Sequence, residues 1–344
     1  MADVFSPGER LERTLNKKGT ERPPVICPGG MMNAAIVDVM EKGGHTLPEA
    51  HHDGGLMSAL AEDVSAYTGF ENFGLPFCMT VEPEALGGSV DYGSLKCEPK
   101  IAREIFARAE AAWYCEKGAI ARSKRGGEVL KAVNILSEKH PDIPVIGSLT
   151  GPVSSAASLV EQFAFFKDLY RDKENSHKFL SYVTDQLIDW ALLMIECGAS
   201  VISIADPTAT GEILGPRLFE EYALLYINRI VNAVHGAGKP VIVHICGDIK
   251  TVKKHFFSLQ GDALSVDAMV NLAEIKKENA AVTTMGNLST YLLESGSPER
   301  INMAARALIE KNIDIMAPAC GLSTSSPLAN IQSFTGAVKE ARRG

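Results

Sequence analysis

Three side chains of metal-binding type stand near the ends of two predicted strands. His244 and Cys246 lie in Val-Ile-Val-His-Ile-Cys-Gly-Asp (residues 241–248), and Cys320 precedes a glycine in Met-Ala-Pro-Ala-Cys-Gly (residues 316–321). Because side chains alternate along a strand, His244 and Cys246 project to the same side. One imidazole and two thiolates suit Zn²⁺, and three protein ligands leave a fourth position open for catalysis. The sequence predicts an open zinc site, although His-x-Cys alone is a weak signal and also occurs in buried cores.

The elements that must position these residues follow a regular alternation. Short β-branched runs predict eight strands, at 24–27, 75–79, 143–148, 200–205, 240–245, 263–266, 281–285 and 313–317. Longer amphipathic stretches between them predict helices, among them 155–170, 176–197, 216–235 and 298–311. Strands that alternate with helices pair in parallel, and eight such units predict an α/β fold of the (β/α)₈ TIM-barrel class. A doubly wound open sheet is the alternative.

The chain is predicted to form a single domain over residues 1–344. Residues 1–20 form an N-terminal helical extension, with the helix itself at 8–18. Residues 28–69, with three glycine pairs, are expected to be an elaborated first loop and not a second core. We find no internal repeat or linker.

In barrels the active site lies at the C-terminal ends of the strands. Three polar residues at such ends complete the predicted site, namely Asp206, Asp267 and Asn287. Asp206 is expected to bind substrate or cofactor, or to hydrogen-bond a metal ligand; the alternative is a cap for the loop that follows. Asn287 is expected to line the same mouth.

Several other polar groups are assigned to the solvated surface. Glu82 and Glu84 are expected at a solvated rim, and His51-His52-Asp53 in a surface loop. The short basic run at 122–125 is expected to be a solvated turn.

Composition excludes other classes. Of 344 residues, 46% are hydrophobic and 22% charged, which is typical of a globular protein. A net charge of −8 argues against nucleic acid as a partner. No apolar run is long enough to span a membrane, and no secretory signal is evident, so we expect a cytoplasmic protein. Seven scattered cysteines are an odd number and do not form a disulfide framework.

The His244-x-Cys246-Gly247 and Cys320-Gly321 motifs resemble the zinc motif of the cobamide-dependent methyltransferases in the uroporphyrinogen decarboxylase superfamily. Further matching stretches follow in the expected order from about residue 20 onward, at 151–152, 202–207, 264–267, 286–287 and 317–321. The resemblance implies a (β/α)₈ barrel with one zinc held by His244, Cys246 and Cys320. Asp267 stands where these enzymes carry an acidic residue that can fill the fourth zinc position; as an aspartate it could also act through water or by orienting a ligand.

The same resemblance implies the reaction. A methylated corrinoid, presented by a small corrinoid-binding protein, would give its methyl group to a small thiol such as coenzyme M, activated as a zinc thiolate. Tetrahydrofolate as acceptor, or demethylation of a methoxylated or methylated substrate toward Co(I), are alternatives, because the first loop, Cys-Pro-Gly-Gly-Met-Met-Asn at 27–33, is more apolar than expected.

Two alternative hypotheses for the function of the protein come from other functional classes. A metal-free decarboxylase-type lyase is disfavoured because residues 27–33 contain no arginine for tetrapyrrole carboxylates. A non-catalytic corrinoid-binding scaffold is disfavoured because the Asp-x-His-x-x-Gly signature is absent from the sequence.

Overall fold

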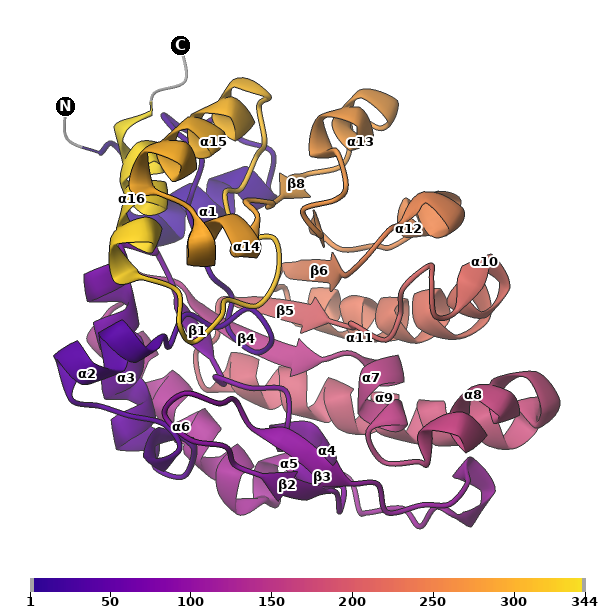
Figure 1. Ribbon diagram of the computed structural model, residues 1–344. Helices are drawn as coiled ribbons and strands as arrows, with labels where there is room; N and C mark the ends of the chain where they lie inside the picture. The colour runs from indigo at the N-terminus through magenta and orange to yellow at the C-terminus, as the bar shows by residue number, and fades with distance from the viewer. Residues whose placement is uncertain (1–2, 342–344) are drawn as a thin grey trace.

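A parallel sheet of six strands forms the centre of the computed structural model, which describes residues 3–341 (Figure 1). The strands, in spatial order, are β1 (Phe73–Leu75), β4 (Val145–Thr150), β5 (Val201–Ala205), β6 (Val241–Ile245), β7 (Ala263–Val266) and β8 (Thr284–Met285). All five strand pairs are parallel. The predicted α/β class with consecutive parallel strands is therefore confirmed. β1 begins before its predicted position and ends at residue 75, because the proline at 76 has no N–H for the ladder.

Two further segments continue the sheet through single bridges instead of regular strands. Ile315 pairs in parallel with Met285 of β8, and Met316 pairs in parallel with Val25. Prolines at positions 23, 24, 28 and 318 flank these bridges and cannot donate to a ladder. The predicted strands at 24–27 and 313–317 are thus correct in place but shorter than expected.

Backbone and side-chain hydrogen bonds join the first segment to β1. The Glu71 N–H donates to the Val25 carbonyl at 2.9 Å. The Asn72 side chain accepts from the Cys27 N–H at 2.8 Å and donates to the Cys27 carbonyl at 2.9 Å, as a neighbouring strand would. The fold is a (β/α)₈ barrel in which two of eight positions are irregular.

The barrel interior is a packed core closed at one end by the N-terminal helix. Seven of the barrel positions contribute to one buried cluster, through Ile26, Ile146, Val201, Ile242, Ala263, Met285, Ile315 and Ala317. Leu11 and Leu15 of α1 (Pro7–Leu15) belong to the same cluster. The predicted N-terminal helix therefore seals the end of the barrel where the strands begin. Residues 1–2 of the predicted extension lie outside the described residues.

Helices cover the outside of the barrel and connect its strands. They are α2 (Val37–Gly43), α3 (Gly54–Thr68), α4 (Val81–Ala85), α5 (Ala119–Arg122), α6 (Lys124–Lys139), α7 (Pro152–Ala157), α8 (Gln162–Arg171), α9 (Lys173–Glu196), α10 (Gly215–Leu218), α11 (Leu225–Gly236), α12 (Lys253–Phe256), α13 (Leu272–Glu278), α14 (Thr290–Ser295), α15 (Pro298–Glu310) and α16 (Leu328–Glu340). Short 3₁₀ turns lie at Glu49–His51, Ala109–Ala111 and Lys250–Val252, and a hairpin pairs β2 (Ser89–Asp91) with β3 (Lys100–Arg103). No helix within residues 3–341 is both long and apolar enough to cross a membrane.

Two predicted helices are close to those observed and two are interrupted. α9 and α15 match the predictions at 176–197 and 298–311. The stretch predicted as one helix at 155–170 is divided between α7 and α8. A π-helical segment, Phe219–Leu224, separates α10 from α11 inside the predicted helix at 216–235.

The prediction of a loop over residues 28–69 was wrong, because this segment contains α2 and α3. The glycine pair at 54–55 begins α3, and the Asp53 carboxylate caps it by accepting from the Leu56 N–H at 2.9 Å. A Cβ at Gly54 would lie 2.6 Å from the Glu128 carbonyl oxygen of α6. The glycine therefore serves the close approach of two helices. α3 packs against β1 as the helix of the first barrel unit.

Candidate metal centre

The three predicted metal ligands lie together at the C-terminal end of the barrel. The ligand atoms of His244, Cys246 and Cys320 are all within 4.8 Å of one another. The His244 Nε2 lies 3.1 Å from the Cys246 Sγ, which lies 3.9 Å from the Cys320 Sγ. A tetrahedral zinc with Zn–S bonds of about 2.3 Å separates two sulfurs by about 3.8 Å. The chemistry and spacing of these donors therefore fit Zn²⁺.

β6 and β7 fix the orientation of the histidine. His244 is fully buried, and its Nδ1 lies 2.9 Å from the Oγ of Ser265, also fully buried, on the adjacent strand. For Nε2 to bind a metal it must be unprotonated, so Nδ1 carries the proton and donates it to Ser265. Sequence reasoning missed Ser265, although the alternation of β7 places it on the same face of the sheet as its neighbour His244.

The cysteine pair favours one thiolate before any metal binds. Hydrogen bonds from Cys246 and His244 lower the pKa of Cys320. The same hydrogen bond to Cys320, together with burial, raises the pKa of Cys246. A metal ion that accepts both sulfurs would remove the remaining proton from the pair.

The first loop approaches the cysteines through a methionine. The Met31 Sδ lies 3.9 Å from the Cys246 Sγ. A Cβ at Gly321 would lie 2.6 Å from the Met31 carbonyl oxygen, so the glycine after Cys320 allows the loop and the last barrel segment to meet.

The predicted acidic neighbour, Asp267, lies outside the ligand cluster. Its negative charge contributes to the raised pKa of Cys246, which places it in the surroundings of the centre. The Asn287 side chain donates to the carbonyls of Asp267 and Val270, both at 2.8 Å. Asn287 therefore holds the loop that carries Asp267. Direct ligation by Asp267 stays a prediction.

Asp206 is fully buried at the end of β5 and caps a neighbouring helix. Its carboxylate accepts from the N–H groups of Val153 and Ser154, each at 2.9 Å, and from the Ser154 hydroxyl at 2.6 Å. These hydrogen bonds hold the N-terminus of α7 against the end of β5, which is a structural role for Asp206. Binding of a cofactor by Asp206 stays a prediction.

The assignment of Glu82 to a solvated rim was wrong. Glu82 lies in the first turn of α4 and is fully buried. Its carboxylate accepts from the Thr150 N–H at 2.9 Å and from the Thr150 hydroxyl at 3.2 Å. Burial raises the pKa of Glu82 to about 7. Glu82 therefore fixes the C-terminal end of β4.

Two further surface assignments were wrong, at residues 125 and 51. The Arg125 guanidinium is buried and donates to the Cys78 sulfur at 2.9 Å, to the Thr80 hydroxyl at 3.1 Å and to Glu84 at 2.6 Å. His51 is also buried, and burial together with the charge of Arg125 lowers its pKa to about 3. His51 lies in a three-residue 3₁₀ turn and has no periodic signal, whereas Arg125 lies in the first turn of α6, one turn before the buried Val129 on the same face of the helix.

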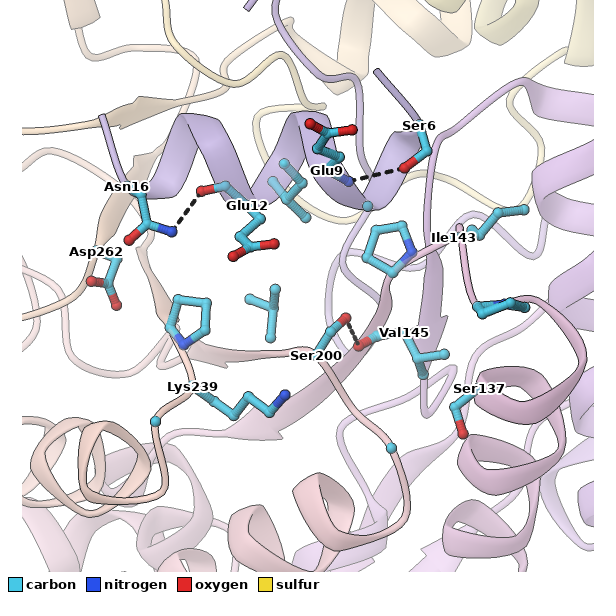
Figure 2. A pocket seen from close by; sticks show the side chains of 18 of the residues that line it. Ser6, Glu9, Glu12, Asn16, Ser137, Ile143, Val145, Ser200, Lys239 and Asp262 are labelled. Atoms are coloured by element: carbon cyan, nitrogen blue, oxygen red, sulfur yellow. Dashed lines mark hydrogen bonds between the residues drawn. The ribbon is translucent and has the colours of Figure 1, made fainter. Parts of the chain in front are cut away.

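Cavities lie at both ends of the barrel. One of about 330 Å³ is lined by Cys320, Met31 and Glu98 and by residues of α14. The larger one, about 630 Å³, lies beneath α1 at the opposite end, where Figure 2 shows Glu9 and Glu12 above Ser200 and Lys239. Barrel enzymes place their chemistry at the C-terminal end of the strands, so the smaller cavity is the candidate substrate site.

The chain resembles known proteins over nearly its full length. The model of the uroporphyrinogen decarboxylase (URO-D) family matches residues 6–341. The methylcobamide:CoM methyltransferase MtbA of Methanosarcina acetivorans is 33% identical over 97% of this chain and 98% of its own. The methylcobamide:CoM methyltransferase MtaA of Methanosarcina barkeri is 29% identical over 98% of each chain.

Structural comparison agrees with the sequence relatives. A solved methyltransferase from Methanosarcina mazei, 29% identical, superposes with a TM-score of 0.90 over 98% of this chain and 99% of its own. Uroporphyrinogen decarboxylase of a Synechococcus species is 29% identical over only 57% of this chain. The chain belongs to the uroporphyrinogen decarboxylase family and, within it, resembles the methylcobamide:CoM methyltransferases along its whole length.

Proposed function

We propose that this protein is an enzyme that transfers a methyl group from a methylated corrinoid, carried by a small corrinoid-binding protein, to a small thiol. The observation that carries the proposal is the His244, Cys246 and Cys320 cluster at the C-terminal end of the barrel. Relatives named methylcobamide:CoM methyltransferases support the donor and the thiol class of acceptor.

The metal we assign to the cluster is Zn²⁺, held by His244, Cys246 and Cys320. Bound there, it would lower the pKa of a coordinated thiol and keep it as a thiolate at neutral pH. Ser265, which accepts from Nδ1, orients the ring so that Nε2 faces the two sulfurs, and the three ligands leave one position for the acceptor sulfur. Asp267 is the residue we assign to that position, or to its surroundings, when no acceptor is present.

The proposed reaction is a displacement at the methyl carbon, in which sulfur replaces cobalt. The acceptor sulfur forms a bond to the methyl carbon, and the carbon–cobalt bond breaks with its electron pair remaining on cobalt. Methyl-Co(III) is thereby reduced to Co(I), and the thiolate becomes a methyl thioether.

The competing lyase has weaker support. No arginine stands in residues 27–33, and resemblance to a decarboxylase covers little more than half of the chain. Tetrahydrofolate as acceptor is an outcome of the spectrophotometric assay when a folate replaces the thiol.

The test is a spectrophotometric assay in which the protein is mixed with methylcobalamin and a thiol. We expect loss of the methyl-Co(III) absorbance with wild type and at least about a hundredfold slower loss with Cys246→Ser. The matched control is Cys97→Ser, which changes an exposed cysteine and should keep wild-type activity. Equal rates for wild type and Cys246→Ser, or demethylation by a folate but by no thiol, would contradict the proposal.

A further inference from the structure

The cavity beside Cys320 is lined by two carboxylates and, among residues 3–341, by no basic side chain. It holds about 330 Å³, and the side chains lining it include Met31, Glu98, Tyr291, Glu294 and Cys320. Among the described residues that line it there is no lysine or arginine. Any substrate whose sulfur reaches the cysteine centre from this side places the rest of its chain near these two acids.

Each carboxylate is held by one neutral hydrogen-bond donor. The Asn33 amide donates to Glu98 at 2.7 Å, and the Ser323 hydroxyl donates to Glu294 at 2.8 Å. Within residues 3–341, neither glutamate lies within 4.0 Å of a basic group in an ion pair. His51 acts on Glu98 electrostatically, but the pKa of His51 is lowered to about 3, so it adds no positive charge at neutral pH. An amide and a hydroxyl orient the carboxylates without neutralising them, so their negative charge is directed at whatever occupies the cavity.

The cysteine centre does not compensate for this charge. Two thiolates and a neutral imidazole together match the charge of one Zn²⁺, so the loaded centre has no excess positive charge for an anionic tail. A negative group in the cavity would therefore meet repulsion from both glutamates, whereas an ammonium group would be attracted by both.

We infer that the small thiol of this site carries a neutral or positively charged tail and not an anionic one. This inference rests on the proposed function and specifies its substrate class. Glu98 and Glu294 act as specificity-determining residues, while the chemistry stays with the cysteine centre. Coenzyme M, the thiol in the names of the relatives, has an anionic sulfonate two carbons from its sulfur and would be a poor acceptor here.

Three thiols with the same two-carbon chain test the inference. They are 2-mercaptoethylamine (cationic), 2-mercaptoethanol (neutral) and coenzyme M (anionic). Glu98 is partly exposed, but desolvation by the surrounding side chains raises its pKa, so the assay is run at pH 8 to keep it ionised. We expect kcat/KM for methylcobalamin demethylation with the amine to exceed that with coenzyme M by about tenfold or more at low ionic strength, and the ratio to shrink in high salt.

Charge-neutralising variants separate the enzyme's preference from the reactivity of each thiol. Dividing a variant's amine-to-coenzyme M ratio by that of wild type cancels the intrinsic reactivities. We expect this quotient to fall severalfold in Glu98→Gln and in Glu294→Gln, and further in the double variant. Glu310→Gln, the same change at an exposed position at the end of α15, should leave the quotient at one.

Calorimetric binding of the three thiols to the zinc-loaded protein gives a readout independent of turnover. Tighter binding of the amine than of coenzyme M supports the inference. Equal or tighter binding of coenzyme M, or quotients of one in both glutamate variants, would overturn it. Failure of all three thiols to accept the methyl group would refute the proposed function, and the binding order would still decide the charge preference.

Discussion

The orientation of His244 by Ser265 leads to a quantitative prediction for Ser265→Ala. Both side chains are fully buried, and one 2.9 Å hydrogen bond joins them. Removing the hydroxyl leaves the Nδ1–H of His244 without a partner in a site that water does not reach, which costs about 1–3 kcal/mol. A loss of that size corresponds to about a 5- to 150-fold weaker zinc affinity, because about 1.4 kcal/mol is a factor of ten.

Competition with a chromophoric chelator measures the zinc affinity of the variant, and urea unfolding of the metal-free protein measures its stability. Ser265→Thr keeps the hydroxyl and should retain an affinity close to that of wild type. Ser58→Ala removes a serine hydroxyl that bonds within α3, far from the cysteines, and should leave zinc affinity unchanged. A Ser265→Ala affinity within twofold of wild type would refute the assigned role of the hydroxyl.

Two further predictions concern buried acids. Burial raises the pKa of Glu82 from 4.5 to about 7, so the folded state binds its proton more tightly than the unfolded state does. The free energy of unfolding of wild type should fall by about 3 kcal/mol as the pH rises through this interval, and that of Glu82→Gln should not. Urea unfolding at pH 5 and pH 8 measures both. The same pH dependence of the unfolding free energy in wild type and variant would contradict the prediction. Glu71 accepts from the fully buried guanidinium groups of Arg10 and Arg22, so Glu71→Gln should cost about 3–5 kcal/mol in thermal unfolding. Glu340→Gln, which removes an exposed ion pair, should cost less than about 1 kcal/mol, and equal losses in the two variants would contradict the prediction.

The position of the cysteine centre could be predicted because it follows from the alternation of side chains along a strand and from the parallel arrangement of the strands. Alternation along β6 puts His244 and Cys246 on one side, and parallel strands bring their C-terminal ends to the same end of the barrel. Cys320 follows the last barrel segment, so it had to arrive at that end as well.

Buried polar residues could not be predicted in the same way, because their burial depends on partners far away in the sequence. Glu82 is separated by 68 residues from Thr150, whose N–H and hydroxyl bind it. Arg125 is buried against Cys78, which lies 47 residues earlier. In each case the polar side chain lies in the first turn of a helix, where exposed polar residues are common, and only the tertiary fold supplies the partner.

Helix α3 begins at an N-cap residue that also stands beside a glycine pair. Glycine pairs favour a loop, but Asp53 precedes a stretch of apolar residues and is an N-cap type of residue. Gly54 is required by the close approach of α6 and not by a turn. The N-cap at Asp53 is therefore a better predictor of the start of α3 than the glycine content is.

X-ray absorption at the zinc edge tests the central claim most directly, because it counts the sulfur ligands of the metal. For the zinc-loaded protein we predict two sulfurs at about 2.3 Å together with a nitrogen at about 2.0–2.1 Å, and three sulfurs after an acceptor thiol is added. Loss of one sulfur in Cys320→Ser would confirm that this residue is a ligand. A sulfur count that does not change on addition of thiol, or that is the same in Cys320→Ser as in wild type, would contradict the account.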